Sequence, residues 1–541
     1  MKYQVRLLFD KIFTVLASSS VVLMTVILLV VLGPMILRGS RAVFFKSTTG
    51  FRKMQLDVYE RGNHEKIEKQ IAEVQVHRDY IYKKMDAFKK GIDTEDFADK
   101  AKNIYRQFGK DLKANGVSGD QLSSRRAFAR QIRNDLNDAF ESDDKNQIMS
   151  ILNGMDKYKD DPRIAGTSAE KFFSLADDFR EVIVDFDLSK REVYADAFAE
   201  FEELVRKLLG PRPDEPLPAM IMDRYGATRY DLSNNLLQEI LWKRQWVEQG
   251  EGLAMVEQKV ERVKDFAGTD LEEIFSYLPD NFDEIMGFRK TIYWQYFIDD
   301  STSGHYFGGV GPEILGTLLL TVLAMIMVFP LGVISAAYLV ECTSDNAAVR
   351  LIRMCINTLA GVPSIVFRLF GLAFFVLFLL PAFGAPSKPC ILAASMTLAV
   401  LTLPVMIRAS EEAIRSVPNS YKEASLGLGA SRFSTFVKVT LPAALPGILT
   451  GVILSVGRVA GETAPILFTG ACAFGAIPKS LFAQTRTLSY GSYDIAVGDK
   501  IGMMVPHNQY GMVVTLVLLI ICLNGMAIYL RAKIFRRLKG Y

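Results

Sequence analysis

Hydrophobic and polar positions divide the chain into two kinds of material. Residues 12–37 form a predominantly apolar run without charge, and residues from about 40 to 310 are charged and mostly polar. Beyond residue 312 the chain is again apolar and sparsely charged. A helix of 26 residues, rising 1.5 Å per residue, is long enough to cross a hydrocarbon layer about 30 Å thick. The pattern therefore predicts an integral membrane protein with a large polar insertion after its first span.

Further apolar runs follow the polar insertion. They cover residues 314–340, 354–381, 391–407, 445–472 and 512–530. Together with the first run they predict six transmembrane helices in an all-α fold. The first run is longer than the apolar core of a signal peptide, which reaches only about 15 residues, so we expect it to be retained as a span.

Basic residues predict the orientation of these spans. The tail after the last run carries Arg531, Lys533, Arg536, Arg537 and Lys539. Cytoplasmic segments are enriched in Lys and Arg, so we expect the C-terminus inside the cell. Each span changes the side of the membrane, so counting the spans back from the C-terminus places the loop after residue 408 inside the cell. The same count places residues 39–310 outside and the N-terminus inside. Basic side chains also follow the first run, but long loops translocate largely regardless of charge.

The polar insertion reads as a mainly helical extramembrane domain. Mixed charges alternate there with apolar residues at helical spacing. Residues 211–218 contain four prolines and predict a stiff linker between two lobes. Trp242, Trp246 and Trp294 are expected in the core of the second lobe. The predicted organisation is therefore 1–38, the N-terminus and first span; 39–310, the external domain; and 311–541, a core of five spans.

The composition excludes several classes of function. A net charge of +3 is too small to suggest binding of nucleic acid. The five cysteines and four histidines show no metal-ligand spacing, and no phosphate-binding loop of the G-x-x-x-x-G-K-[ST] type is present. We therefore expect no catalytic site, no metal and no bound cofactor on this chain.

The polar segment 411–442 lies between the fourth and fifth predicted spans. Residues 416–428 can form a short amphipathic helix with Ser416 as a possible N-cap. Gly429 can adopt the left-handed conformation that ends it, and a second helix over 431–439 is expected to stop at Pro442. The product is a helical hairpin with an exposed end, which can sit in a groove of a partner and move as a rigid body.

The spacing within this hairpin resembles a known family motif. Residues 423–425 read E-A-S, Gly429 follows after three residues, and V-T-L-P at 439–442 follows after nine more. This is similar to the E-A-A coupling loop of permease subunits in ATP-binding-cassette importers, with Ser425 and Val439 as mild departures. The resemblance implies that ATPase contact is made by Glu423, Ala424, Ser425, Gly429, Val439, Leu441 and Pro442.

Two further segments narrow this resemblance. G-R-V-A-G-E-T-A-P at 457–465 and P-S-I-V-F at 363–367 resemble the A-type permease subunit of phosphate-specific importers, the PstA family. The family implies a type I ABC importer permease core in the lipid of the inner membrane. It implies a second, C-type permease, a dimer of ATPase subunits that bind ATP and Mg, and an external phosphate-binding protein. ATP hydrolysis then belongs to a partner, and this chain is not an enzyme.

Arg458 and Glu462 are the charged residues of the fifth apolar run. At i and i+4 they would share one helix face within ion-pairing range. A charge inside a membrane helix costs about 2.5–3.5 kcal/mol on insertion scales, so both should face the protein interior or water. Pro465 can break the helix just afterwards. The residues alone allow two interpretations: a transient binding site for an oxyanion, or a structural ion pair between helices. The family resemblance favours the anion site and adds Thr463 to the residues of the substrate pathway.

Two other arginines are candidates for the same path. Arg408 ends the fourth apolar run, where an arginine commonly snorkels to the interface; the resemblance implies a role in anion passage instead. Arg368 stands where related proteins usually have glycine. It could contact the anion, pair with an acidic residue of the second permease, or be an isolated peculiarity.

The function predicted from the sequence is that of a permease subunit of an ATP-driven phosphate importer. Import of another oxyanion, such as sulfate or molybdate, is the close alternative. A membrane sensor that uses the external domain is the alternative from a different class, although no cytoplasmic output domain is evident in the sequence.

Overall fold

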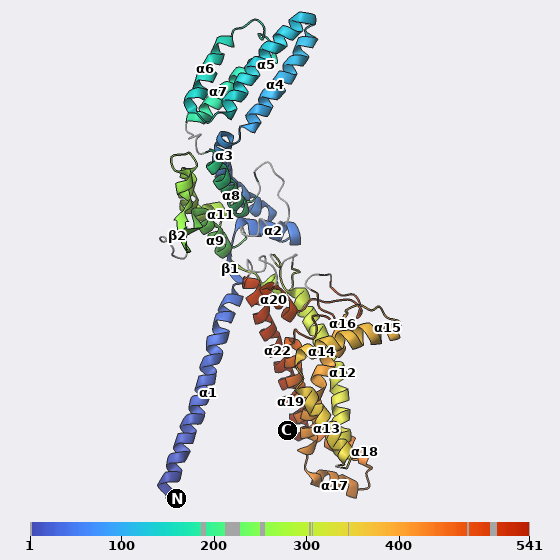
Figure 1. Cartoon of the computed structure of the whole chain (residues 1–541). Helices are drawn as coiled ribbons and strands as arrows, with labels where there is room; N and C mark the ends of the chain where they lie inside the picture. The colour runs from blue at the N-terminus through green and yellow to red at the C-terminus, as the bar shows by residue number, and fades with distance from the viewer. Residues whose placement is uncertain are drawn as a thin grey trace. The chain divides into compact units, whose positions relative to one another are not determined.

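The chain forms two compact units in a computed structural model (Figure 1). Residues 1–45 and 291–541 make the core unit, and residues 46–290 make the inserted unit. The structure describes residues 3–184, 191–210, 212, 228–248, 255–301, 305, 307–344, 346–472, 475, 477–497 and 506–539.

The core unit is mainly helical, with non-helical connections such as residues 462–472. Its membrane-length elements and their extensions are α1 (Tyr3–Ser40), α12 (Gly311–Ala337) continued by η8 (Tyr338–Cys342), α14 (Ser364–Phe370) continued by η9 (Gly371–Leu379) and α15 (Leu380–Ala382), α16 (Ile391–Arg415), α19 (Leu441–Gly461) and α22 (Pro506–Lys539). Its shorter elements are η6 (Trp294–Phe297), α13 (Ala347–Ala360), α17 (Asn419–Gly427), α18 (Arg432–Thr435), η10 (Phe436–Thr440) and α20 (Leu488–Val497).

Six helices are long and apolar enough to cross a membrane, which confirms the predicted number of spans. They are Asp10–Ser40, Gly311–Cys342, Ser364–Ala382, Ile391–Arg415, Arg432–Gly461 and His507–Arg536. The predicted all-α membrane fold is therefore confirmed for the core. In the most apolar window of the first span no residue is buried within the chain, as expected of a helix that lies in lipid or against a partner.

Several predicted span limits were wrong for identifiable reasons. The third run, predicted from residue 354, is divided at Pro363, whose extended backbone (ψ 140°) separates α13 from α14. The fourth helix continues beyond Arg408 to Arg415, since charged residues prolong it outside the apolar layer. The fifth span ends at Gly461 rather than at residue 472, because Glu462 leaves the helix with ψ 125°.

Helix α16 is the centre of the core unit, with 67% of its apolar window buried. It packs against α12 on one side and α19 on another. Glycines permit this close approach: a Cβ on Gly332 of α12 would lie 2.6 Å from Met406, and one on Gly451 of α19 would lie 2.6 Å from Ala409. Small residues at membrane-helix interfaces let backbones approach in this way.

The inserted unit is mainly helical, as predicted, with one hairpin of strands. Its helices are α2 (Thr49–Tyr59), α3 (His64–Ile92), α4 (Glu95–Ala114), α5 (Gly119–Glu141), α6 (Lys145–Met155), η1 (Asp156–Tyr158), η2 (Ser168–Glu170), α7 (Lys171–Val184), α8 (Arg191–Leu209), α9 (Tyr230–Leu241), η5 (Arg262–Phe266), α10 (Glu272–Asp280) and α11 (Phe282–Met286). Strands β2 (Trp242–Glu248) and β3 (Met255–Glu261) pair antiparallel, with Trp242 opposite Glu261.

One hydrophobic core runs through the inserted unit, from Ile81 to Met286 along the sequence. Phenylalanines dominate it; Phe201, for example, lies 5.1 Å from Phe275 between ring centroids. The chain before and after the predicted linker therefore contributes to one core. Apart from Arg212, the linker 211–218 itself lies outside the described residues.

The expectation that the three tryptophans form a core in the second lobe was wrong. Trp242 and Trp246 lie on β2, with Trp246 63% exposed, and Trp294 of the core unit is 58% exposed. A two-stranded ribbon has no second layer to cover its faces, so strand tryptophans remain at the surface. The core is instead formed by helix side chains such as Phe108 and Leu136, which are fully buried.

The division between the units falls inside β1 (Phe44–Ser47) and β4 (Arg289–Ile292), which pair with each other. Residues 291–310 thus belong with the core unit rather than with the insertion. They pack on the start of α12: the Val310 amide donates to the Tyr296 carbonyl at 2.7 Å, and a Cβ on Gly309 would collide with that carbonyl oxygen at 2.2 Å. Whether the insertion is external stays a prediction.

Candidate functional site

The charged pair of the fifth span lies where its helix ends. Arg458 is in the last turn of α19, and Glu462 follows the helix in an extended conformation. The nearest nitrogen and oxygen of the two side chains are 3.6 Å apart, and the side chains are 33% and 21% exposed. The expectation that both share a helix face was wrong for Glu462, yet the ion pair forms because the turn keeps its carboxylate beside Arg458.

The backbone opens at this pair, before Pro465 is reached. Residues 464–470 form turns, and the Glu462 carbonyl accepts a hydrogen bond from Ser489 Oγ at 3.4 Å. Thr463 lies in this non-helical stretch, half-buried. Such a break places backbone polar groups next to the charged pair, which is tolerated at membrane depth only in protein or beside water.

Arg408 and Arg458 lie at different levels of the core unit. Gly451 of α19 faces Ala409 of α16, so Arg408 lies level with residue 451. Arg458 is seven residues further along α19, about 10 Å at 1.5 Å per residue. Arg408 Nε donates to Asn357 Oδ1 of α13 at 2.7 Å, and its side chain is exposed. The two arginines therefore lie at two separate positions along the core unit rather than in one site.

Arg368 reaches the segment that follows Glu462. Its guanidinium carbon lies 3.7 Å from the centroid of the Phe468 ring, a cation–π geometry. Phe468 belongs to the turns after α19, six residues beyond Glu462. The structure thus brings Arg368 and Glu462 to the same turn segment, but through Phe468 and not by a direct contact.

The polar segment between the fourth and fifth spans is a helical hairpin. Its first helix, α17, begins after Pro418, whereas the sequence predicted a start at Ser416. The helix ends at Gly427. Gly429 has φ +85°, the left-handed conformation that the sequence predicts, with open space around its α-carbon. Ser431 caps α18 by accepting from the Ser434 amide at 3.2 Å. Ser425 and Thr435 hydroxyls lie 3.0 Å apart and join the two arms.

The second arm of the hairpin is continuous with the fifth span. The prediction that Pro442 ends this arm was wrong, because Pro442 occupies the first turn of α19, where a missing N–H costs little. Half-buried Val439 and Leu441 lie in this continuous stretch. Helical structure therefore runs from Arg432 to Gly461 without interruption. The second arm of the hairpin and the helix that carries Arg458 are therefore one continuous helical element.

The tip of the hairpin presents uncovered side chains. Leu428 is 91% exposed, and Tyr421, Leu426 and Phe433 are also exposed. Glu423 and Ala424 lie on the same exposed hairpin. Apolar side chains gathered on a small protruding element are typical of a protein interface.

A buried ionic cluster, which the sequence did not reveal, lies at the start of α12. Glu313 Oε1 is 3.5 Å from Arg486 Nη1, and both side chains are almost fully buried. Arg486 Nη2 also donates to Asp300 Oδ1 at 2.6 Å. Ser301 Oγ lies 3.2 Å from Glu313 Oε1 and joins the same network. The cluster ties the entry segment of α12 to the segment between the fifth and sixth spans.

Close backbone packing and a neutral histidine complete this cluster. A Cβ on Gly316 would lie 1.8 Å from the Arg486 carbonyl oxygen, so only glycine fits there. His305 is buried 4.0 Å from Glu313. Burial, and secondarily the Arg486 charge, lowers the pKa of His305 to about 4. The imidazole is therefore neutral at pH 7, and Arg486 is the cation that compensates Glu313. The available signal was a glutamate at the edge of an apolar run.

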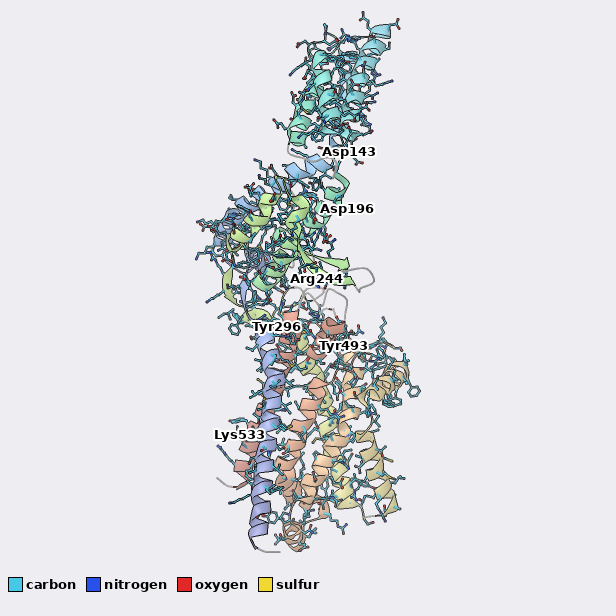
Figure 2. The ribbon with its side chains drawn as sticks, turned by 60° about the vertical axis from the view of Figure 1, so that its left-hand side comes forward. Asp143, Asp196, Arg244, Tyr296, Tyr493 and Lys533 are labelled. Atoms are coloured by element: carbon cyan, nitrogen blue, oxygen red, sulfur yellow. The ribbon has the colours of Figure 1, made fainter. Side chains whose placement is uncertain are left out.

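The hairpin and the ionic cluster are at opposite ends of the core unit. In Figure 1, α17 and α18 lie at one end and α20 at the other. Tyr296 and Tyr493 lie together at the α20 end, whereas Lys533 of α22 lies well along the unit toward the hairpin end (Figure 2). The Arg458 pair lies at the end of α19 that is remote from the hairpin.

Comparisons with known proteins identify this core. Residues 328–540 match the family model described as binding-protein-dependent transport system inner membrane component. The probable ABC transporter permease protein YqgI of Bacillus subtilis is 38% identical over 196 residues, 36% of this chain and 63% of that protein. The phosphate transport system permease protein PstA of Mycobacterium leprae is 39% identical over 175 residues, 32% and 55% of the two chains.

Another relative is covered over more of its length. The probable phosphate transport system permease protein PstA of Methanocaldococcus jannaschii is 32% identical over 209 residues, 37% of this chain and 72% of that protein. The chain spans 55–63% of the length of the first two relatives. Among solved structures, an inward-facing MetNI methionine ABC transporter matches at 21% identity and a TM-score of 0.28, over 42% of this chain and 94% of that one.

Proposed function

Because this chain belongs to the PstA family of ABC importer permeases, we propose that it forms half of a pathway that imports inorganic phosphate. The permease core is a type I fold with six spans and lies in the inner membrane, and the members of this family are permease subunits rather than enzymes. The observation that carries the proposal is the charged pair Arg458–Glu462 beside a helix break in the fifth span. Import of another oxyanion, such as sulfate or molybdate, is the alternative.

The pair has the chemistry of a station for an oxyanion. A guanidinium offers five donors in a planar fork that matches phosphate oxygens. Its nearest contact to Glu462 is 3.6 Å, longer than a hydrogen bond, so the carboxylate does not saturate these donors. The carboxylate would instead weaken anion binding enough for release, as conduction requires. Arg408 would act as a second station nearer the hairpin, and Arg368 would extend the first station through Phe468.

Transport would be driven by partners that this chain does not contain. We assign the exposed hairpin tip, with Leu428 and Phe433, to the groove of an ATPase subunit that binds ATP and Mg. A C-type permease would form the other half of the passage, and an external binding protein would deliver phosphate. The hairpin and α19 form one continuous helical path, so closure of the ATPase dimer would move the helix that carries Arg458.

The inserted unit would act as an external docking or gating accessory. Its mixed surface charge and its position after the first span support a location outside the membrane. It has no cysteine, so an oxidising compartment would leave it unchanged.

Reconstituted transport tests the proposed function. The chain would be coexpressed with its neighbouring permease, ATPase and binding protein, purified as a complex and placed in liposomes. We expect uptake of radiolabelled phosphate that requires ATP and is not competed by a tenfold excess of sulfate or molybdate. Competition by either anion would assign a different oxyanion, and absence of an ATPase from the purified complex would exclude the importer and favour a sensor.

The left-handed glycine provides a test of the coupling hairpin. Gly429→Val places a β-branched residue at φ +85°, which costs more than the roughly 1–2 kcal/mol of an ordinary side chain. Since no atom lies within 4 Å of the added Cβ, the effect is confined to the backbone turn. We expect at least a tenfold loss of uptake and weaker retention of the ATPase, at unchanged membrane insertion.

The matched control for this variant is Gly427→Val. Gly427 lies in the helical part of the same hairpin and also has open space around its α-carbon. Valine is sterically allowed there, so uptake should stay within about threefold of the parent. Equal uptake by the two variants would show that the turn at Gly429 is not required for coupling.

Labelling tests the location of the inserted unit. With the five native cysteines replaced by serine, a single cysteine at exposed Lys110 should react with a membrane-impermeant maleimide in intact cells. A cysteine at exposed Lys533, in the basic C-terminal tail, should react only after the membrane is permeabilised. Protection of the Lys110→Cys variant in intact cells would place the inserted unit in the cytoplasm and overturn the topology.

A further inference from the structure

We infer that the ion pair between Lys422 and Glu341 is a strut that carries movement of the hairpin 419–440 into α12, the first span after the insertion. The inference rests on the proposed function, because it assigns a path to the force that an ATPase would apply. No sequence motif of the hairpin requires this contact: its partners are 81 residues apart.

The strut has the geometry of a strong, directed ion pair. Lys422 Nζ lies 2.5 Å from Glu341 Oε1, and the two side chains are only 17% and 25% exposed. Exposed pairs contribute little, because water and salt screen them and side-chain entropy opposes them. A pair that is mostly withdrawn from water is screened less, so its geometry is held more firmly.

The strut joins the hairpin to a span that is not its neighbour in sequence. The chain itself connects α17 to α16 through residues 416–418 and connects α18 to α19. In the fully described stretch 419–427, no residue is buried within the chain. The polar side-chain contacts of that stretch are the Ser425–Thr435 bond inside the hairpin and the Lys422 strut. The chain already joins the hairpin to α16 and α19, and the strut is the polar link that joins α17 to α12 as well.

The receiving end of the strut is braced on its other side. Arg353 of α13 donates from Nη2 to the Leu339 carbonyl at 3.0 Å. Its Nε lies 3.1 Å from Glu411 of α16. Leu339 and Glu341 both belong to η8, the π-helical turn that ends α12, and such turns occur often at functional positions. Because η8 is held between α13, α16 and α17, it transmits displacement rather than bending freely.

Helix α12 can deliver that displacement to the far end of the core unit. Together with η8 it is a continuous 32-residue element from Gly311 to Cys342. At its opposite end Glu313 is held by Arg486, in the buried cluster that also fixes the segment before α20. The helix is thus clamped by an ion pair at each end. Hairpin movement would reach both sides of the membrane through this continuous element, in addition to the direct route through α19.

Charge reversal tests the strut in the assembled importer. Lys422→Glu and Glu341→Lys each place like charges at the contact, and the double variant restores opposite charges. The measured quantity is phosphate transported per ATP hydrolysed in liposomes, with ATPase retention measured on the same preparations. We expect each single reversal to lower this ratio about tenfold or more, equivalent to at least about 1.4 kcal/mol of lost coupling, and the double variant to recover it to within about threefold.

The matched control is Lys438→Glu, which reverses an exposed charge in the other arm of the same hairpin. We expect its transport per ATP to stay within about twofold of the parent. A neutral variant, Lys422→Gln, removes the attraction without adding repulsion and should lower the ratio severalfold. If a charge reversal prevents assembly, this neutral variant still tests the strut.

The outcomes separate this inference from the proposed function. A parent complex that takes up no anion refutes the proposed function itself. A parent that transports phosphate, with normal coupling in Lys422→Gln, overturns the strut alone. Failure of the double reversal to exceed the single variants, in complexes that retain their ATPase, also overturns it. Loss of ATPase retention in step with loss of transport would make the pair a docking contact, and the strut would again be wrong.

Discussion

Arg458→Gln and Glu462→Gln are each expected to abolish phosphate uptake while the complex still assembles. Removing Arg458 leaves a carboxylate alone on the path of an anion, where it repels the substrate. Removing Glu462 leaves a guanidinium whose charge nothing offsets, so that an anion binds too firmly to leave. Truncating one partner of a buried ion pair typically costs 3–5 kcal/mol. Because this pair is partly exposed, we expect about a hundredfold loss of uptake in each variant.

Exchanging the two charges distinguishes an anion station from a structural staple. Arg458→Glu combined with Glu462→Arg retains an ion pair, so the complex should assemble better than either single variant. Transport should not return, because the arginine would then project from the extended residue after the helix instead of from its last turn. A fork that recognises phosphate depends on that orientation.

The control for this series is Lys100→Gln, which removes an i, i+4 ion pair with Asp96 on an exposed helix of the inserted unit. Such pairs are worth about 0.3–0.5 kcal/mol, so uptake should be unchanged. Normal uptake by either neutral variant, or full recovery in the exchanged variant, would make the pair a staple and place the anion elsewhere.

The spans were predictable because membrane helices are selected for one property, a long apolar run, that needs no knowledge of tertiary contacts. Their limits were not, since a helix ends where the backbone changes direction. Pro363 divides the third run although its neighbours are apolar, and α19 ends at Gly461 although apolar residues continue. Pro442 looked like a stop but occupies a first turn, where proline fits. Hydropathy does not report any of these backbone angles.

The same distinction applies to the functional residues. Arg458 and Glu462 are only four residues apart, so their pairing could be predicted from local spacing, although Glu462 lies just beyond the end of the helix. Gly429 likewise follows a fixed local spacing. The pairs Lys422–Glu341 and Arg486–Glu313 join segments far apart in sequence, and their partners depend on how α12 packs. The prediction that the tryptophans are buried failed for a related reason. Aromatic content does not show which face of a strand hairpin other elements will cover.

The buried cluster at the start of α12 carries the largest expected effect on stability. Arg486→Met removes the cation beside the fully buried Glu313. Glu313 then keeps Ser301 and His305 as near neighbours. His305 has a pKa lowered to about 4 and cannot supply the missing charge at neutral pH. Leaving a buried carboxylate without a cation costs about 3–5 kcal/mol. We therefore expect a large drop in the melting temperature of the purified complex, measured by loss of soluble protein on heating.

Neutralising both partners should recover most of that loss. In Arg486→Met with Glu313→Gln no buried charge is left, and the Gln amide can still bond Ser301. Asp300, the other partner of Arg486, is 57% exposed and remains solvated when the guanidinium is gone. Replacing a buried ion pair by neutral groups of similar size is often close to neutral for stability. The double variant should therefore melt nearer to the parent than to Arg486→Met.

The comparison is controlled by Arg163→Met, which removes an ion pair with Asp161 from an arginine that is 47% exposed. Its melting temperature should stay close to that of the parent, since surface pairs contribute about 0–1 kcal/mol. If Arg486→Met melts like this control, Glu313 is neutral in the folded protein and the cluster does not clamp α12. If the double variant melts below Arg486→Met, the pair holds the helix start by its shape and hydrogen bonds rather than by compensation of charge.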